Sequence, residues 1–234
     1  MPSSDSERPF VLAHQRFLAD KESFAGLNLA QRFARIHDTN LWGAEESASG
    51  LGSEMDVTAV LRAELPRLLA RLGAASLLDA PCGDAGWINQ TDLGVRYLGI
   101  DIVPDLIEKL RACAGAGEIR GEYRLADITA DDLPRCDAIL CRDCLVHLSF
   151  ANIARAVANF RASGAAWLIA TTFPGWQTNA DCEDGDWRAL NFERAPFNWG
   201  ASVELLNEDC QEAGGDWRDK SLGVWSLSAV VPDK

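Results

Sequence analysis

The amino-acid sequence predicts an α/β fold built on a doubly wound sheet of seven strands. Three observations support this prediction. From about residue 57, short apolar stretches alternate with segments of helical periodicity, which is typical of parallel strands joined by right-handed crossovers. A glycine turn follows the first apolar stretch. Finally, acids follow three successive stretches, at Asp79, Asp101 and Asp127, where ligands bind in open sheets.

The N-terminal part contains little that suggests a sheet. Residues 1–20 begin with polar side chains, and we expect them to be frayed. Apolar residues then recur at helical spacing over 27–36, which predicts a helix. The small residues of 47–53 are too polar for a core and predict either a disordered linker or a loop that closes on a ligand. We therefore expect residues 1–56 to form a helical lid, and 57–234 to form the main domain.

The main domain contains the regular alternation. Helices are expected over 57–72, from near Trp87, over 104–113 and over 150–161, where Ser149 can cap the N-terminus. Strands are expected over 76–80, 96–100, 123–126, 138–141, 166–171, 203–207 and 222–227. The segment 173–200 is long for a loop but rich in aromatic residues, which argues against disorder. It is therefore expected to be an insertion that caps a substrate site.

The segment Ser76 to Asp101, SLLDAPCGDAGWINQTDLGVRYLGID, predicts a nucleoside-cofactor site. Its turn can offer backbone N–H groups to a ligand, and Asp101 can accept hydrogen bonds from both hydroxyls of a ribose. A dinucleotide site requires G-x-G-x-x-G, but Pro81 stands at the first glycine. Asp79 would repel a pyrophosphate and attract the ammonium of a methionine moiety. The segment therefore favours S-adenosyl-L-methionine (SAM) over NAD.

The motif Asp79-Ala-Pro-Cys-Gly83-Asp-Ala85 resembles the first motif of class I SAM-dependent methyltransferases, with departures at Pro81 and Ala85, where glycines are usual. The resemblance implies a Rossmann-like sheet of seven strands, with the last strand antiparallel to the others. It also implies that Asp101 holds the ribose and that Asp127 reaches the adenine amino group. Ile102 and Ile128 would pack on the adenine faces. The cofactor-binding residues that it implies are Asp79, Gly83, Asp101, Ile102, Asp127 and Ile128.

The segment CRDCLVHLS leaves the fourth strand and contains the candidate catalytic residues, Asp143 and His147. Because they are four residues apart, one helical turn would place them on the same side. His147 could then remove a proton from an oxygen or nitrogen nucleophile while Asp143 orients the imidazole. The alternative is that Asp143 caps a turn, His147 packs near the cofactor, and catalysis depends on alignment.

Substrate contacts are expected from Arg142, Trp187 and Arg188. A guanidinium such as that of Arg188 can bind an anionic group with two hydrogen bonds, although an arginine packed on an aromatic ring is an equally good interpretation. His14 and His37 are assigned no role.

Composition excludes several classes of function. The net charge of −13 argues against nucleic-acid binding, since phosphates require basic patches. Seven scattered cysteines suggest a reducing compartment, and Cys141 and Cys144 lack the partners of a zinc site, so no metal is expected. There is neither an apolar signal region nor a membrane-spanning stretch, so a cytoplasmic protein that does not bind membranes is expected, with a homodimer as an option.

A narrower resemblance covers residues 33–228. The blocks SGLGS, LDAPCGDAGW, YLGIDIVPDLI, CRDCLVHLS, ATTF, GDWRALNFERAPF and DKSLGVW are similar to a bacterial methyltransferase group associated with capsular polysaccharide modification, including O-methyl phosphoramidate formation. The resemblance implies methylation of an O or N nucleophile on a small polar or anionic metabolite, such as a phosphorylated or sugar-like intermediate. The alternatives are a SAM-binding regulatory protein without turnover and, less favoured, an NAD oxidoreductase.

Overall fold

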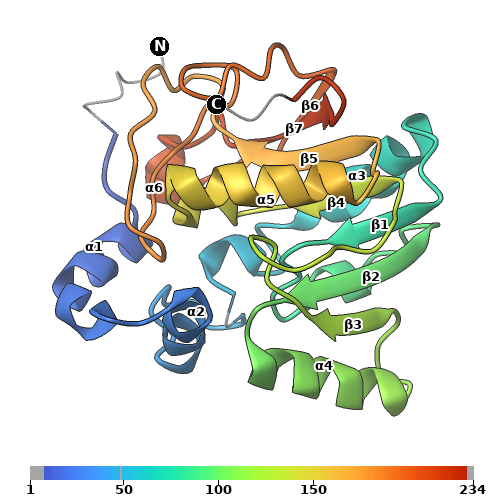
Figure 1. Ribbon diagram of the computed structural model, residues 1–234, viewed down its shortest axis with the longest axis horizontal. Coiled ribbons are helices and arrows are strands. Elements are labelled where there is room, and N and C mark those ends of the chain that lie inside the picture. Colours follow the sequence, from blue (N-terminus) through green and yellow to red (C-terminus); the bar gives the residue numbers. More distant parts are fainter. Residues whose placement is uncertain (1–7, 48, 231–234) are drawn as a thin grey trace.

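The computed structural model describes residues 8–47 and 49–230. These residues form a seven-stranded sheet in the order β3-β2-β1-β4-β5-β7-β6 (Figure 1). The strands are β1 (Ser76–Asp79), β2 (Arg96–Asp101), β3 (Glu122–Leu125), β4 (Ala138–Cys141), β5 (Trp167–Thr172), β6 (Glu204–Asn207) and β7 (Ser221–Ser226). Strands β1 to β5 pair in parallel, whereas β7 is antiparallel to both β5 and β6. The predicted fold class is confirmed, including the antiparallel last strand.

The described residues also form helices, some of which begin at capping side chains. They are α1 (Leu12–Ala19), α2 (Leu29–Asp38), α3 (Ala59–Arg71), α4 (Pro104–Gly115), α5 (Phe150–Ala162) and the short α6 (Glu212–Gly215). Asn28 and Gln31 form a reciprocal capping box before α2. The Ser149 hydroxyl accepts a hydrogen bond from Asn152 N at the start of α5, as predicted. Short 3₁₀ turns are η2 (Lys21–Phe24), η3 (Leu51–Ser53), η4 (Ile88–Gln90) and η5 (Leu145–His147).

Two predictions about these elements are wrong. Residues 12–19, expected to be frayed, form α1, because Phe17 is buried against Phe24 with ring centroids 4.9 Å apart. The helix expected from near Trp87 is only the turn η4. The chain leaves that turn at once, and Gly94, with φ of +68°, introduces β2.

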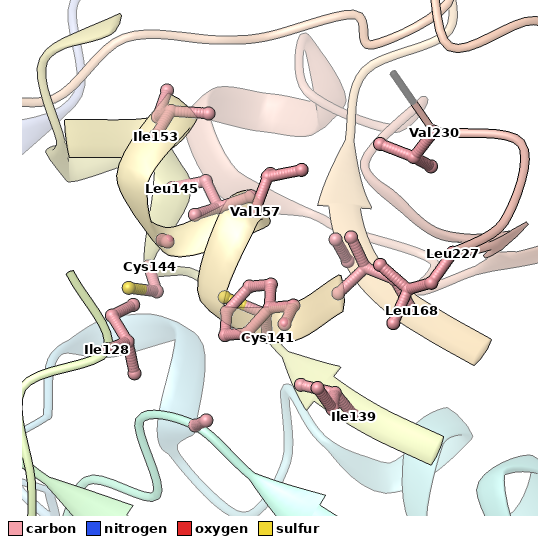
Figure 2. Close-up of a cluster of buried hydrophobic side chains, with 14 of the residues drawn as sticks. Ile128, Ile139, Cys141, Cys144, Leu145, Ile153, Val157, Leu168, Leu227 and Val230 are labelled. Atoms are coloured by element: carbon pink, nitrogen blue, oxygen red, sulfur yellow. The ribbon is translucent and has the colours of Figure 1, made fainter. Parts of the chain in front are cut away.

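Helices cover both faces of the sheet. Leu78, Ile139 and Leu168 point toward α5 and pack against Ile153 and Val157. Figure 2 shows this packing for the two strand residues Ile139 and Leu168. The alternate strand residues point the opposite way, toward the leucine-rich faces of α3 and α4; they are Leu77, Leu140 and Ile169. Because successive strand residues face opposite sides, two apolar cores form with the sheet between them. Cys141 and Cys144 are buried in the first core.

The order of the strands determines where a ligand-binding crevice lies. The chain runs outward from β1 through β2 to β3, then returns to β4 on the other side of β1. In such sheets the carboxyl ends of the strands at this reversal form the ligand site. In Figure 1, α1 and α2 lie beside this end of the sheet. Within the described residues, no helix has the length and apolarity needed to cross a bilayer.

The segment 173–200 contains no helix or strand but is tightly held. The Asn191 amide donates to the carbonyls of Pro174 and Trp176, at 3.0 and 2.9 Å. Near its other end, Phe192 stacks on Trp199 with ring centroids 4.0 Å apart. Its aromatic residues therefore fix an ordered loop against the sheet.

Candidate active site

The glycine turn after β1 is shaped by its contact with the end of β2. Gly83 has φ of +54°, and its N–H donates to Asp101 Oδ2 at 3.1 Å. Asp101 Oδ1 accepts from Val103 N at 3.0 Å. Gly99, which the sequence analysis did not single out, is also required, because a Cβ there would lie 2.9 Å from Cys82 Cβ. Each Asp101 oxygen accepts one backbone hydrogen bond and retains a lone pair for a ligand.

Asp79 is a buried acid at the end of β1. Only 4% of its surface is exposed, and the Tyr97 hydroxyl donates to its Oδ2 at 2.8 Å. Burial raises the pKa of Asp79 to about 7, against the opposing effects of Tyr97 and Arg142. A cation bound beside this carboxyl would favour its charged form.

A cavity at the carboxyl ends of β1 and β2, the first cavity, is lined by all six residues that the resemblance implies for cofactor binding. They are Asp79, Gly83, Asp101, Ile102, Asp127 and Ile128. Asp127 also closes its own turn, because its Oδ1 accepts from the N–H and hydroxyl of Thr129, both at 2.7 Å. The sequence motifs therefore converge on one place in the fold.

The N-terminal segment forms the other wall of the first cavity. Its lining residues are Leu29, Phe33, His37, Trp42, Ser49 and Ser53. The segment is fastened to the glycine turn, since the Ser47 hydroxyl donates to Asp84 Oδ2 at 2.6 Å and Asp84 N donates to Ser49 Oγ at 2.8 Å. His37, to which the sequence analysis assigned no role, thus faces the candidate cofactor site. The sequence could not show this position of His37, because it depends on how α2 packs against the rest of the fold.

A second cavity adjoins the first. It is lined by residues 11–13 and 49–52, by the aromatic residues Trp42, Phe173, Trp187 and Trp217, and by Asp143, His147, Glu212 and Lys220. Four residues line both cavities: Trp42, Ser49, Asp143 and His147. The two candidate catalytic residues therefore lie at the junction. Glu212, Trp217 and Lys220 were not predicted to line a site, because folding brings them to the cavity from a distant part of the chain.

A buried ion cluster forms one wall of the junction. Lys220 Nζ lies 2.6 Å from Asp143 Oδ2 and 3.6 Å from Glu208 Oε2, and Arg142 Nη2 lies 2.6 Å from the same Glu208 oxygen. Burial disfavours the charge of Asp143, but Lys220 and Arg142 outweigh it and hold its pKa well below the usual range. Asp143 is thus a fixed anion, and so a weak candidate for a base.

His147 is held as a neutral imidazole. Its Nδ1 lies 2.8 Å from the Asp186 carbonyl oxygen, which can only accept, so Nδ1 carries the proton and Nε2 has a free lone pair. Trp42 stacks on the ring at 4.5 Å, and burial lowers the pKa of His147 to about 4. The Asp186 carbonyl is therefore the orienting group, in place of the expected Asp143 carboxylate. Asp143 has φ of +48° and precedes η5, so no shared helical turn forms.

The turn that carries His147 is strapped by residues 185–188. All four carbonyls of 145–148 accept hydrogen bonds from this strap. Their donors are Gly185 N to His147 O, Arg188 N to Val146 O, and the Arg188 guanidinium to Leu145 O and Leu148 O. Arg188 Nε donates to Ala180 O at 3.2 Å, and Arg188 is not among the described residues lining either cavity. Its guanidinium thus positions the His147 turn, rather than clamping an anion as expected, whereas Trp187 and Arg142 do face the cavities.

Among the described residues, no group of three or more His, Cys, Asp or Glu side chains could hold a metal ion.

Comparison with known proteins gives the fold but no close relative. No protein-family model and no curated protein sequence matches the chain. The methyltransferase domain of bacterial-CtHen1-C matches 74% of this chain and 99% of that domain, with a TM-score of 0.53 and 14% identity. N-methyltransferase NodS from Bradyrhizobium japonicum WM9 matches 75% of this chain and 98% of its own, with a TM-score of 0.49 and 18% identity.

The PH0226 protein from Pyrococcus horikoshii OT3 matches over 51% of this chain and 59% of its own, with a TM-score of 0.42 and 20% identity. At these identities the likeness concerns the fold. The chain has the Rossmann-like fold of the methyltransferase domain of bacterial-CtHen1-C.

Proposed function

We propose that this protein is a SAM-dependent methyltransferase that holds SAM in the first cavity. The observation that carries the proposal is the convergence of all six motif residues on the strand ends of a methyltransferase fold. Asp101 would accept from the ribose hydroxyls, Asp79 would face the methionine ammonium, and Asp127 would reach the adenine between Ile102 and Ile128. The cofactor would supply an electrophilic methyl group on a sulfonium.

The chemistry would take place where the cavities meet. A nucleophile entering from the second cavity reaches the walls formed by His147 and Asp143. His147 Nε2 is free to take a proton from it, because Nδ1 is committed to the Asp186 carbonyl. Asp143 stays anionic between Lys220 and Arg142, which match its charge and fix this wall of the junction. Proton removal and alignment therefore come from different elements.

The acceptor that we propose is a small polar metabolite with an oxygen or nitrogen nucleophile. The resemblance to the capsular-modification group suggested a phosphorylated or sugar-like intermediate. The anionic option depended on Arg188, whose donors are engaged by backbone carbonyls. The aromatic lining of the second cavity, which includes Trp187, supports a compact acceptor.

Residues 27–53 and 173–200 would act as the cover that excludes water during transfer. Both supply residues to the cavity walls: Trp42 and Ser49 from the first segment, Phe173 and Trp187 from the second. Amide hydrogen exchange should slow in both segments when S-adenosylhomocysteine (SAH) is bound. Equal protection with and without SAH would make them plain scaffold.

Calorimetry with SAH and NAD tests the proposed function. We expect SAH to bind with a micromolar Kd and NAD not to bind. Incubation with methyl-labelled SAM and a metabolite extract should then transfer label to small molecules. Absence of SAH binding would refute the cofactor assignment, whereas SAH binding without any transfer would indicate a regulatory SAM-binding protein.

A further inference from the structure

We infer that the second cavity is the acceptor site and that it takes a small amine on an apolar body, with the amine nitrogen at the junction beside His147. This inference rests on the proposed function and narrows the acceptor to nitrogen. The location follows from geometry, because the second cavity shares Trp42, Ser49, Asp143 and His147 with the first. A molecule bound there has direct access to the methyl group that the first cavity would present.

Charge favours a cation over an anion in the second cavity. Its charged lining residues are two acids, Asp143 and Glu212, and one base, Lys220. The Lys220 charge is already matched, since its Nζ lies 2.6 Å from Asp143 and 3.6 Å from Glu208. Behind it, Arg142 pairs with Glu208 at 2.6 Å, so this cluster of four is balanced.

Glu212 is the charged lining residue that this balanced cluster leaves unmatched. Its carboxylate has no hydrogen bond or salt bridge within the described residues. Burial raises the pKa of Glu212, and the nearby Lys220 ammonium offsets this only in part. A phosphate or carboxylate entering the cavity would meet this anion without finding an unmatched cation. An ammonium would be attracted by Glu212.

Aromatic residues make up much of the remaining wall. Phe173, Trp187 and Trp217 lie near one another with ring centroids 5.1–5.9 Å apart and interplanar angles of 78–84°. Walls of this kind favour organic cations through their ring faces and also bind apolar bodies. The indole N–H groups of Trp42 and Trp217 are buried without a partner among the described residues, but neutral donors do not decide the charge. The acids do.

The transfer step balances for an amine. The ammonium loses one proton, which exposes the nitrogen lone pair. The lone pair then forms the N–C bond to the methyl carbon as the C–S bond breaks, and the sulfonium becomes the neutral thioether of SAH. The product ammonium gives up a second proton to reach its neutral form. Neutral Nε2 of His147 is the acceptor in reach for the first of these protons and passes it to solvent.

Three probes of matched shape test the inference: 2-phenylethylamine, 2-phenylethanol and phenylacetate. Each is titrated into the SAH-saturated full chain by calorimetry, and each is assayed for transfer of labelled methyl. We expect the amine to bind at least tenfold more tightly than the other two and to be the methylated probe. Binding of the amine no tighter than that of the alcohol, including no binding of any probe, would overturn the inference.

Substitutions at Glu212 provide the matched variants. Glu212→Gln should weaken amine binding at least tenfold and leave SAH affinity unchanged, whereas Glu212→Lys should make phenylacetate the preferred probe. Glu108→Gln, on the exposed face of α4, is the control and should change neither. Unchanged probe preference in both Glu212 variants would overturn the amine assignment. If the wild-type protein does not bind SAH, the proposed function itself is overturned.

Discussion

The two cavities differ in how the sequence encodes them. The first is built from residues at or just beyond the ends of strands, at Asp79, Asp101 and Asp127, with Gly83 in the turn. The second is built from segments that lie far apart in the chain, including residues 42–52, 143–147, 173–187 and 212–220. Parallel pairing aligns strand ends automatically, so a cofactor site has a local signature. Loops that meet in space have none, and an acceptor site is correspondingly free to vary.

The largest effect is expected where the cavities meet. His147→Ala removes the only lone pair assigned to proton removal and should lower kcat by about 10²–10⁴. SAH affinity should change little, because the motif residues of the first cavity remain. Single-turnover transfer of labelled methyl and SAH calorimetry on the same variant measure the two effects separately. Full turnover in His147→Ala would show that alignment alone drives the reaction.

The glycine turn should be almost as sensitive, but in binding. Gly83→Val places a branched side chain at φ of +54° and a Cβ 2.3 Å from Ser49 Oγ. We expect SAH affinity to fall by at least about 100-fold, equivalent to about 2.7 kcal/mol. Gly94→Val is the matched control, because Gly94 has φ of +68° with nothing within 4 Å of an added Cβ. The control should lose stability yet bind SAH normally, and equal losses of affinity would argue against a specific role for the turn.

The role of Arg188 separates the sequence-based and structure-based accounts. Arg188→Met removes the guanidinium that holds the carbonyls of Leu145 and Leu148, and so loosens the turn beneath His147. We expect kcat to fall by roughly tenfold with KM little changed, as for an interaction that matters in the transition state. The melting temperature should fall as well. An increase confined to KM for an anionic acceptor would restore the clamp that the sequence suggested.

The smallest effect is a linkage between pH and cofactor binding. The pKa of Asp79 is raised to about 7, so near neutral pH the carboxyl is partly protonated. The SAH ammonium favours the anion, so binding should release roughly half a proton at pH 7. Affinity should accordingly rise as pH increases through 7 and level off above it. Calorimetry in phosphate and in Tris measures the proton directly, and an identical enthalpy in both buffers would contradict the placement of Asp79 beside the ammonium.

Much of the fold was predictable because its signals are local. Strand positions and the capping of α5 by Ser149 follow from periodicity and turn chemistry, whereas the antiparallel last strand was implied by the family resemblance. The helix expected near Trp87 was wrong because the local signal misled: the apolar residues there pack around a short turn instead of a helix. Helix α1 was missed because Phe17 is buried only by tertiary contact with Phe24.

The candidate site shows the same contrast between residues with a local sequence signal and residues that only folding brings together. The family resemblance implied all six candidate cofactor residues, and the structure brings them together in one cavity. His147 was identified, but its orienting group was not, because a backbone carbonyl such as that of Asp186 has no sequence signature. Lys220 and Glu208 escaped notice because an ion pair across elements depends on how β7 and its neighbours fold back.

The central claim is that Asp101 lies where a ribose binds, and SAH calorimetry on Asp101→Ala tests it most directly. Loss of a charge-assisted hydrogen-bond acceptor should weaken SAH binding by roughly 1.5–3 kcal/mol. Asp105→Ala, an exposed acid in the first turn of α4, is the matched control and should bind SAH as the wild type does. Thermal unfolding should confirm that both variants are folded. Wild-type affinity in a folded Asp101→Ala variant would contradict the cofactor site and, with it, the account of both cavities.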